Sequence, residues 1–187
     1  MKMKFYQSIK FRLMMMTLCV CVFMGGLISF YSIHQSRLSY KRLAWNYMVD
    51  IALAYGRQVE NLLDQGGSLD SGVLEHILMN ANLEGVESSY TYIVDSEGNM
   101  LYHPNKDKIG KSVENVIVKS YIQDLKSGIK HDTYVVEYDY NGSIKYAACY
   151  TDENGRFILV VSADDDDVLR DSASLIVRVT AISLLIG

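Results

Sequence analysis

Tyrosines are concentrated in one part of the chain, where they could line a binding pocket. The chain has 14 tyrosines among 187 residues, and nine of them lie between residues 90 and 150. An aromatic ring with a hydroxyl tip suits a pocket that is apolar and still orients its ligand. Alternation along a strand would place Tyr134, Tyr138 and Tyr140 on one face. It would likewise place Tyr146 and Tyr150 on one face. Tyrosine also packs well in strands, so packing is the competing interpretation for each residue.

Two other groups could bind a metal ion or a ligand. His103 has no second histidine, cysteine or carboxylate beside it at ligand spacing. It precedes Pro104, the one proline of the chain, so a structural role in a turn is the favoured interpretation. The run from Asp164 to Asp167 lacks the spaced pattern of a calcium loop, and we interpret it as a solvated acidic linker. We therefore expect no metal site and no cofactor.

The sequence shows no arrangement of residues that is typical of catalysis. Its serines and histidines are scattered without a nucleophile elbow, and its glycines form no phosphate-binding loop. The carboxylate pair Glu137 and Asp139 falls on a segment that we expect to be a half-exposed strand. We predict that the chain is not an enzyme.

Charge is distributed unevenly along the chain. Residues 1–33 contain four basic side chains and no acidic one, whereas residues 34–172 contain all 22 acidic side chains and 13 basic ones. A net-acidic body without a lysine or arginine cluster argues against nucleic acid as a partner, because binding to phosphates needs a basic surface.

An apolar segment near the N-terminus predicts a membrane span. Residues 13–33 contain no charged side chain, and a helix of these 21 residues can cross a hydrocarbon layer about 30 Å thick. A cleaved signal peptide is the alternative, but the segment is longer than the usual apolar core and no A-x-A-like cleavage site follows. The basic residues before the span predict that residues 1–12 lie in the cytoplasm.

A second apolar segment covers residues 172–187 and contains one charged residue, Arg178. About 20 residues are needed to cross a membrane. The segment is either the start of a second span or a short apolar helix packed on the body, and the missing helix stop signal favours a truncated span. Residues 34–171 would then lie outside the cytoplasm, between two spans.

The first part of this extracytoplasmic segment predicts helices. No proline interrupts residues 34–64, and apolar side chains follow a heptad spacing there. We call this set the heptad seam; its members are Trp45, Met48, Ala52, Tyr55, Val59 and Leu62. The seam could pack on a sheet, on the same helix of a second subunit, or on both. Gly66 and Gly67 should end the helix, and a shorter helix should cover residues 70–80.

From residue 89 onward the pattern changes to strands. Two hairpins are expected, at residues 91–104 and 133–151, the second around an Asn141-Gly142 turn. Residues 156–163 predict a fifth strand, and residues 116–125 predict a short helix between the hairpins. A long helix, two strands, a helical insert and three further strands indicate an α+β fold with a five-stranded antiparallel sheet.

Short motifs within these elements resemble the Cache family, the PAS-like extracytoplasmic sensing modules of bacterial chemoreceptors, sensor histidine kinases and diguanylate cyclases. The matching features are the Asp-x-x-Gly turn at Asp95 and Gly98, the His103-Pro104 pair, the Gly110-Lys111 step, the Asn141-Gly142 hairpin and the acidic tail before the second span. The resemblance covers roughly residues 35–187. One sheet between two spans is similar to the single-module type.

The resemblance implies a pocket between the sheet and the helical insert, on the face away from the long helix. Relatives that bind amino acids are similar in using a strand carboxylate for the ligand ammonium, which makes Asp164 a candidate. Those relatives also carry an arginine ahead of the third strand, and this chain has none between Arg57 and Arg156. The resemblance therefore does not extend to amino-acid specificity. A small carboxylate is a candidate ligand because of four lysines, Lys111, Lys119, Lys126 and Lys130. The predicted ligand-binding residues are Tyr92, His103, Tyr121, Tyr134, Tyr146, Tyr150 and Asp164.

The function that the resemblance implies is the sensing half of a membrane receptor. The leading interpretation is a methyl-accepting chemotaxis protein that binds a small molecule outside the cell and shifts its helices across the membrane. The alternatives are the input domain of a histidine kinase or diguanylate cyclase, and a membrane-anchored structural domain without a ligand. We expect a multi-pass protein of the cell membrane that forms a homodimer, because two heptad seams could pair side by side.

Overall fold

The computed structural model describes residues 9–170, and the contacts within it form two units, with a boundary between residues 40 and 41. Helix α1 (Ile9–Asp64) contributes to both units. In the first unit its apolar side chains, among them Leu13, Phe23 and Ile28, are exposed. It is the one described helix whose length and composition would let it cross a membrane. The predicted second span, residues 172–187, lies outside the described residues.

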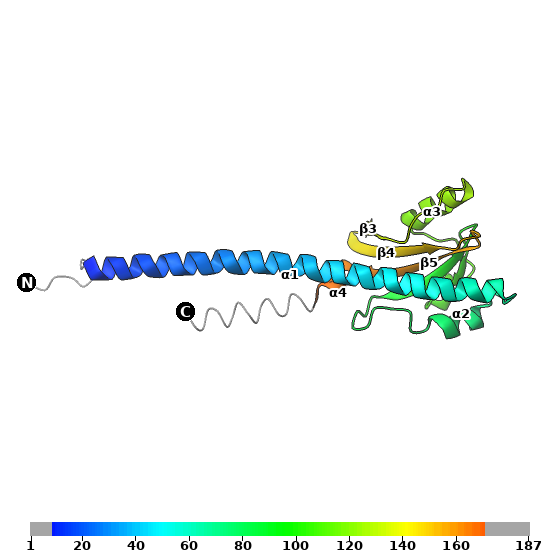
Figure 1. Ribbon diagram of the computed structural model, residues 1–187, viewed down its shortest axis with the longest axis horizontal. Coiled ribbons are helices and arrows are strands. Elements are labelled where there is room, and N and C mark those ends of the chain that lie inside the picture. The colour runs from blue at the N-terminus through cyan, green and yellow to red at the C-terminus, as the bar shows by residue number, and fades with distance from the viewer. Residues whose placement is uncertain (1–8, 171–187) are drawn as a thin grey trace, which may run out of the picture. The chain divides into compact units, whose positions relative to one another are not determined.

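The second unit, residues 41–170, contains a five-stranded antiparallel sheet (Figure 1). Its strands are β1 (Tyr90–Asp95), β2 (Met100–Tyr102), β3 (Val135–Tyr140), β4 (Ser143–Thr151) and β5 (Phe157–Asp164). They lie in the order β2-β1-β5-β4-β3, so β5 joins the two hairpins in the centre of the sheet. This arrangement confirms the predicted α+β fold.

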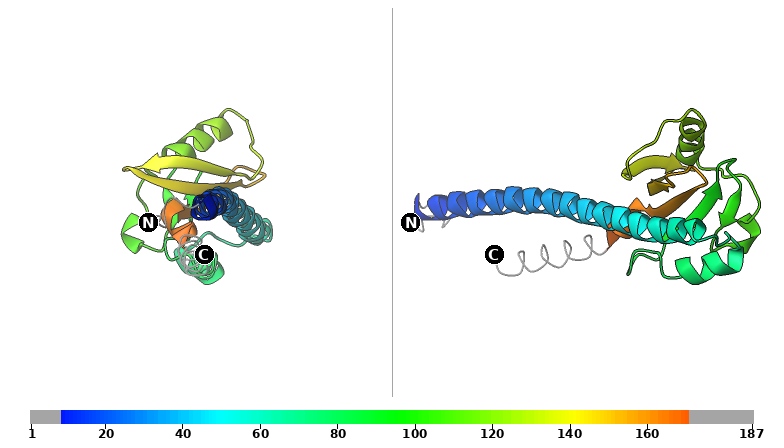
Figure 2. Two further views of the ribbon diagram at one scale, coloured as in Figure 1. Left: turned by 90° about the vertical axis from the view of Figure 1, so that its left-hand side faces the viewer. Right: turned by 45° about the vertical axis from the view of Figure 1, so that its right-hand side comes forward.

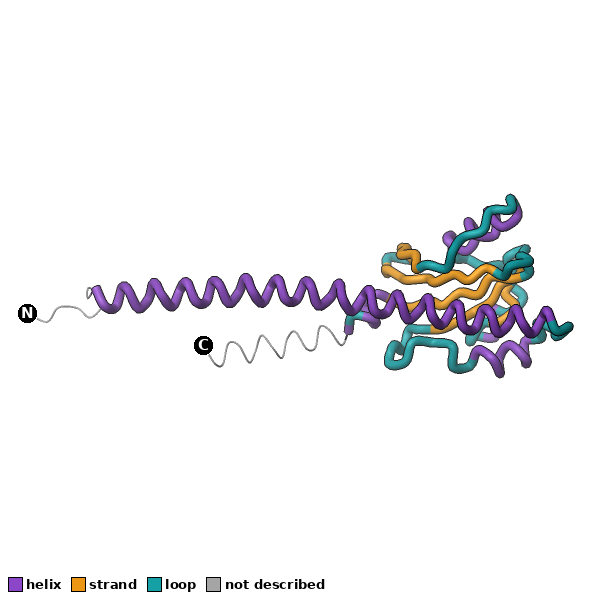
Figure 3. The backbone as a smooth tube through the Cα atoms, viewed as in Figure 1, coloured by secondary structure: helices purple, strands orange, loops and turns teal. Residues whose placement is uncertain are grey.

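Four short helices complete the second unit: α2 (Ser71–Leu78), η2 (Lys106–Lys108), α3 (Val116–Lys126) and α4 (Asp165–Val168). The C-terminal part of α1 and α2 cover one face of the sheet, and α3 covers the other (Figure 2). Segments without regular structure lead from α2 to β1 and from α3 to β3 (Figure 3). The helix α1 ends as predicted, because Gly66 adopts a φ of +82° and its N–H donates to the carbonyl of Leu63.

The heptad seam of α1 packs on the sheet. Met48, Ala52 and Val59 have no exposed surface, and they share one core with strand residues such as Phe157 and Leu159. Burial leaves these three seam residues no surface for a second subunit. Of the alternatives for the seam, the structure supports packing on the sheet.

The β3–β4 hairpin has the tight turn that its sequence predicts. Asn141 and Gly142 have φ angles of +56° and +83°, as a type I′ turn requires. The turn fixes the register, in which Tyr138 lies opposite Lys145 and Glu137 lies opposite Tyr146. Residues opposite each other in an antiparallel pair share a face, so Tyr138 and Tyr146 point to different faces of the sheet.

The acidic run after β5 is folded structure, not the solvated linker that we expected. Asp164 ends β5 and the next residues form α4. Asp167 is buried, accepts a hydrogen bond from the Ser88 N–H at 2.7 Å and forms an ion pair with Arg170 at 2.5 Å. These partners lower the pKa of Asp167, the backbone hydrogen bond from Ser88 being the main cause.

Candidate ligand-binding site

A cavity of about 160 Å³ opens on the face of the sheet that α3 covers. Its lining comes from β1, β2, β3 and β4 and from the segment that leads from β2 to α3. An engineered protein cavity of similar volume holds a benzene molecule. The cavity is therefore large enough for a small molecule.

Aromatic side chains form one wall of the cavity. Alternation along β1 and β3 directs Tyr90, Tyr92, Tyr138 and Tyr140 to this face. The ring of His103 lies 5.1 Å from that of Tyr90 and 5.8 Å from that of Tyr92, measured between centroids. The wall thus combines apolar surface with hydroxyl and imidazole groups that can orient a ligand.

Backbone hydrogen bonds hold another part of the lining, residues 111–113, beside β2. The N–H of Met100 donates to the carbonyl of Lys111 at 2.9 Å, and the N–H of Val113 donates to the carbonyl of Gly98 at 2.8 Å. Gly98 and Gly110 have φ angles of +91° and +79°, which glycine adopts without strain. The two glycines that carried the Cache resemblance therefore place Lys111 at the cavity.

The charges around the cavity are not balanced. Lys145 pairs with Asp164 at 2.5 Å, and Lys108 lies 3.8 Å from Glu114. Lys111 is the lining lysine without an ion pair among residues 9–170. The cavity therefore has a positive charge available for an anion.

Three polar groups of the aromatic wall, His103, Tyr92 and Tyr138, are neutral hydrogen-bond donors at physiological pH. Burial and the nearby charge of Lys108 lower the pKa of His103 below its ordinary value. Its Nδ1 accepts a hydrogen bond from the Asn105 N–H at 2.9 Å. We infer that the proton of the neutral ring is on Nε2. Burial raises the pKa of Tyr92 well above its ordinary value and that of Tyr138 to about 12.

The structure brings together part of the predicted site. Tyr92 and His103 line the cavity, whereas Asp164 does not and instead pairs with the lining residue Lys145. Tyr121 of α3 and Tyr134 form their own aromatic pair, with ring centroids 6.2 Å apart, and neither lines the cavity.

Tyr146 and Tyr150 lie on the face that α1 covers, away from the cavity. Tyr146 has no exposed surface, and its ring packs edge-on against Trp45 with centroids 5.6 Å apart. The hydroxyl of Tyr150 donates to the buried carboxylate of Glu60. Packing is therefore the role that the structure gives both side chains.

Several lining residues were absent from the predicted set. Tyr90 lines the cavity and lies on the same face of β1 as Tyr92. Lys145 also lines it and lies opposite Tyr138, a register that could have been predicted from the Asn141-Gly142 turn. Asn115 lines the cavity and caps α3, its side-chain oxygen accepting from the Ile117 N–H at 2.9 Å. An asparagine just before a predicted helix was the available signal for Asn115.

Comparison with protein-family models finds no match, and comparison with curated proteins finds no significant match. Solved structures give fold similarities to sensor domains. The sensor domain of DcuS from Escherichia coli is 14% identical, with 67% of this chain and 90% of that chain covered and a TM-score of 0.40. The ligand-binding domain of Mlp24 with asparagine is 12% identical (55% and 38% covered, TM-score 0.40).

A third similar structure is the ligand-binding domain of the amino acid chemoreceptor PctC from Pseudomonas aeruginosa in complex with GABA. It is 18% identical, with 50% of this chain and 38% of that chain covered and a TM-score of 0.35. The chain thus spans 38% of the length of the Mlp24 and PctC domains. No residue role in this chain follows from such distant similarities.

Proposed function

We propose that the chain is the extracytoplasmic ligand-sensing region of a transmembrane receptor, and that its cavity binds a small anion such as a carboxylate. The observation that carries this proposal is Lys111, a lining cation without a carboxylate partner among the described residues. A bound carboxylate would accept hydrogen bonds from the ammonium group of Lys111 and from the neutral donors of the aromatic wall.

The charge pairs of the cavity disfavour a cationic ligand. Glu114 already accepts a hydrogen bond from the Tyr140 hydroxyl at 3.1 Å and lies near Lys108. Asp164 is held by Lys145. To pair with Glu114 or Asp164, the ammonium group of a ligand would have to displace Lys108 or Lys145 and would remain close to the positive charge of Lys111. An anionic ligand would instead pair with Lys111 directly.

The receptor that we propose is a methyl-accepting chemotaxis protein. Residues 1–12 would lie in the cytoplasm, residues 13–33 would cross the membrane and residues 34–171 would fold outside, with a second span that begins at residue 172. The Cache-like motifs and the apolar part of α1 support this topology.

The ligand proposal is tested with the 187-residue chain in detergent micelles, titrated with acetate, propionate, succinate and, for comparison, methylamine. We expect a carboxylate to raise the thermal stability, since a ligand at 100 times its Kd adds about 2.7 kcal/mol to the free energy of unfolding. Lys111→Met should weaken the affinity about tenfold to a hundredfold, the range for loss of a charge-assisted hydrogen bond.

Lys119→Met is the matched control, because Lys119 is an exposed lysine of α3 that does not line the cavity. Its carboxylate affinity should equal that of the parent chain. Stabilisation by methylamine alone would contradict an anion site. No stabilisation by any of these compounds would favour a structural domain without a ligand.

We also propose that the receptor is a homodimer in the membrane, with its contact on the side of α1 away from the sheet. Leu43 and Tyr47, four residues apart in the part of α1 that belongs to the second unit, are exposed, and the same helix contains the apolar segment. In a background with Cys19 and Cys21 changed to serine, Leu43→Cys should form a disulfide-linked dimer in cells, because a shared membrane raises the effective concentration. The buried Ala52→Cys should not, and efficient cross-linking at residue 52 would overturn this choice of face.

A further inference from the structure

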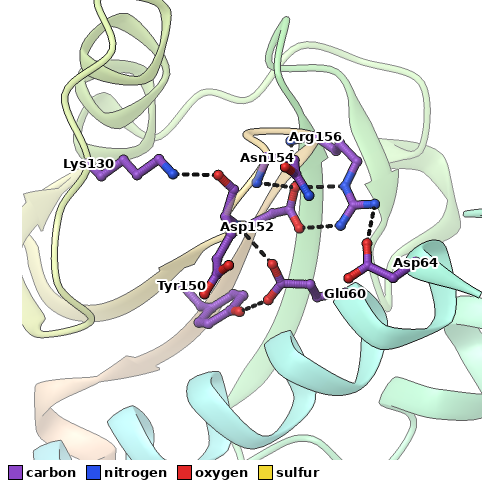
Figure 4. A network of polar contacts seen from close by, with 8 residues as sticks. Glu60, Asp64, Lys130, Tyr150, Asp152, Asn154 and Arg156 are labelled. Atoms are coloured by element: carbon purple, nitrogen blue, oxygen red, sulfur yellow. Dashed lines mark hydrogen bonds and ion pairs between the residues drawn. The ribbon is translucent and has the colours of Figure 1, made fainter.

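The turn between β4 and β5, residues 152–156, lies at one end of the sheet and is held by hydrogen bonds to Asp152 (Figure 4). Asp152 has no exposed surface, and its carboxylate accepts from the backbone N–H groups of Asn154 at 3.2 Å and Arg156 at 2.9 Å. The Arg156 guanidinium donates two further bonds to it, at 2.7 and 2.8 Å. Burial by itself would raise the pKa of Asp152, but the hydrogen bonds from Arg156 outweigh it and the pKa is lowered.

This turn is fastened to the last turns of α1. One carboxylate oxygen of Glu60 accepts from the backbone N–H of Glu153 at 2.9 Å, and the other accepts from the Tyr150 hydroxyl. Arg156 also forms an ion pair with Asp64 at 2.8 Å. Glu60 is buried, so loss of these two hydrogen bonds would leave its carboxylate unsatisfied. The free-energy cost of an unsatisfied buried carboxylate disfavours separation of the turn from α1.

The same turn contacts the helical insert on its other side. Lys130, which follows α3, donates to the backbone carbonyl of Glu153 at 2.5 Å (Figure 4). Leu125 of α3 lies against Gly155. A Cβ atom added to Gly155 would be 3.2 Å from Cδ1 of Leu125. The backbone of Glu153 is therefore bonded to the insert through its C=O and to α1 through its N–H.

The insert also reaches the cavity. Asn115, the cap of α3, lines the cavity, and its side-chain amide donates to the Tyr92 hydroxyl at 3.4 Å. Val118 and Ile122 fix α3 to the cavity face of the sheet through buried contacts. A helix that begins at the cavity thus ends beside the β4–β5 turn.

We propose that the β4–β5 turn couples the helical insert to α1, with Glu60 as the positioning residue that carries a displacement of the insert into the helix. This inference rests on the proposed function for its input, a ligand that moves the insert. A shift of Lys130 and Leu125 displaces Glu153, and Glu60 transmits this displacement to α1. Coupling of this kind is reciprocal, so a change at Glu60 affects the insert in turn.

Amide hydrogen exchange of the 187-residue chain in micelles tests the coupling without any ligand. Lys130→Met removes a contact with the turn and none with α1. It should nevertheless raise exchange in residues 57–64 about threefold to tenfold, the effect of losing one hydrogen bond of typical net strength, because Lys130 is exposed to solvent. Glu60→Gln should raise exchange in residues 116–126. The double variant should change less than the two single variants combined, because both act on one path.

Lys126→Met is the matched control. Lys126 is also an exposed lysine of the insert, but it pairs with Glu97 at 2.7 Å and not with the β4–β5 turn. Exchange in residues 57–64 should be unchanged in this variant. Unchanged exchange in Lys130→Met, or an equal rise in Lys126→Met, would overturn the proposal even if Glu60→Gln failed to fold. Because no ligand is added, this outcome is independent of whether the cavity binds a carboxylate.

Discussion

The two faces of the sheet are built by the same strands but differ in how completely they are filled. On the face that α1 covers, Tyr146, Phe157 and Leu159 have no exposed surface. On the other face, the buried core around α3 gives way to a cavity lined by tyrosines and lysines. Because successive side chains of a strand point to opposite faces, neighbouring residues of β4 and β5 serve different faces.

The difference predicts that substitutions on the two faces have separable effects on folding and on the proposed ligand binding. The close-packed face determines how α1 is fixed to the sheet, and substitutions there should affect folding. The cavity face carries a charge without an ion-pair partner among the described residues, Lys111, and substitutions there should affect binding. Equal effects on folding from the two faces would remove the distinction.

The largest effect should come from Tyr146→Ala. Its ring is fully buried against Trp45, so truncation should lower the free energy of unfolding by about 3 to 5 kcal/mol, as for other large aromatic side chains in cores. Tyr138→Ala on the half-buried cavity face should cost about 1 kcal/mol. Urea denaturation followed by the fluorescence of Trp45, the one tryptophan, measures both. Equal losses in the two variants would contradict the separation of the faces.

A smaller effect should distinguish two glycines that lie in helices. An added Cβ atom at Gly56 would lie 2.3 Å from Cδ1 of Tyr150, whereas at Gly72 it would meet no atom within 4 Å. Alanine in place of glycine stabilises an open helix by about 1 kcal/mol at most, and overpacking in a core costs about 1 to 3 kcal/mol.

Gly56→Ala should therefore lower the urea midpoint, and Gly72→Ala should raise it slightly. A Gly56→Ala variant as stable as the parent chain would show that α1 is not held closely against Tyr150.

The smallest effect should be a pH dependence that arises from the cavity face. Because the pKa of His103 is lowered from its ordinary value of 6.5, the unfolded chain binds more protons than the folded chain just below that pH. The contribution of His103 to stability is complete above pH 6.5 and is lost as the pH falls through its ordinary pKa towards the lowered one. The parent chain should lose more stability than His103→Gln between about pH 7.5 and about pH 5, where carboxyl groups stay ionised. If the free energy of unfolding depended on pH identically in the two chains, His103 would not be the source of the pH dependence.

Most of the fold could be predicted from the sequence, because each element has a local cause. The apolar run, the glycines after residue 64, the alternation from residue 89 and the Asn141-Gly142 turn all act over a few residues. The helix α1, the five strands and the insert α3 lie where these signals predict them. Along this chain the local secondary-structure propensities and the hydrophobic periodicity predict the same elements. Such agreement allows a fold to be predicted from the sequence.

The candidate site could be predicted only in part. Tyr92 lies in the first predicted hairpin and His103 in the His103-Pro104 pair, and both residues line the cavity. The alternation of side chains along a strand correctly placed Tyr146 and Tyr150 on one face, but it did not predict which face of the sheet this is. That choice depends on which helix covers which face, and it is made by the packing of residues distant in the sequence.

Residue types and local spacing therefore determined the elements, the apolar segment and the tyrosine-rich region of this protein. The tertiary structure alone decided that the heptad seam faces the sheet, that Asp164 holds Lys145 and that Lys111 has no such partner among the described residues. It also decided that one turn contacts both α1 and the insert. The physical reason is that local signals act within a few residues, whereas pairing of charges and filling of a face depend on segments that meet only when the chain is folded.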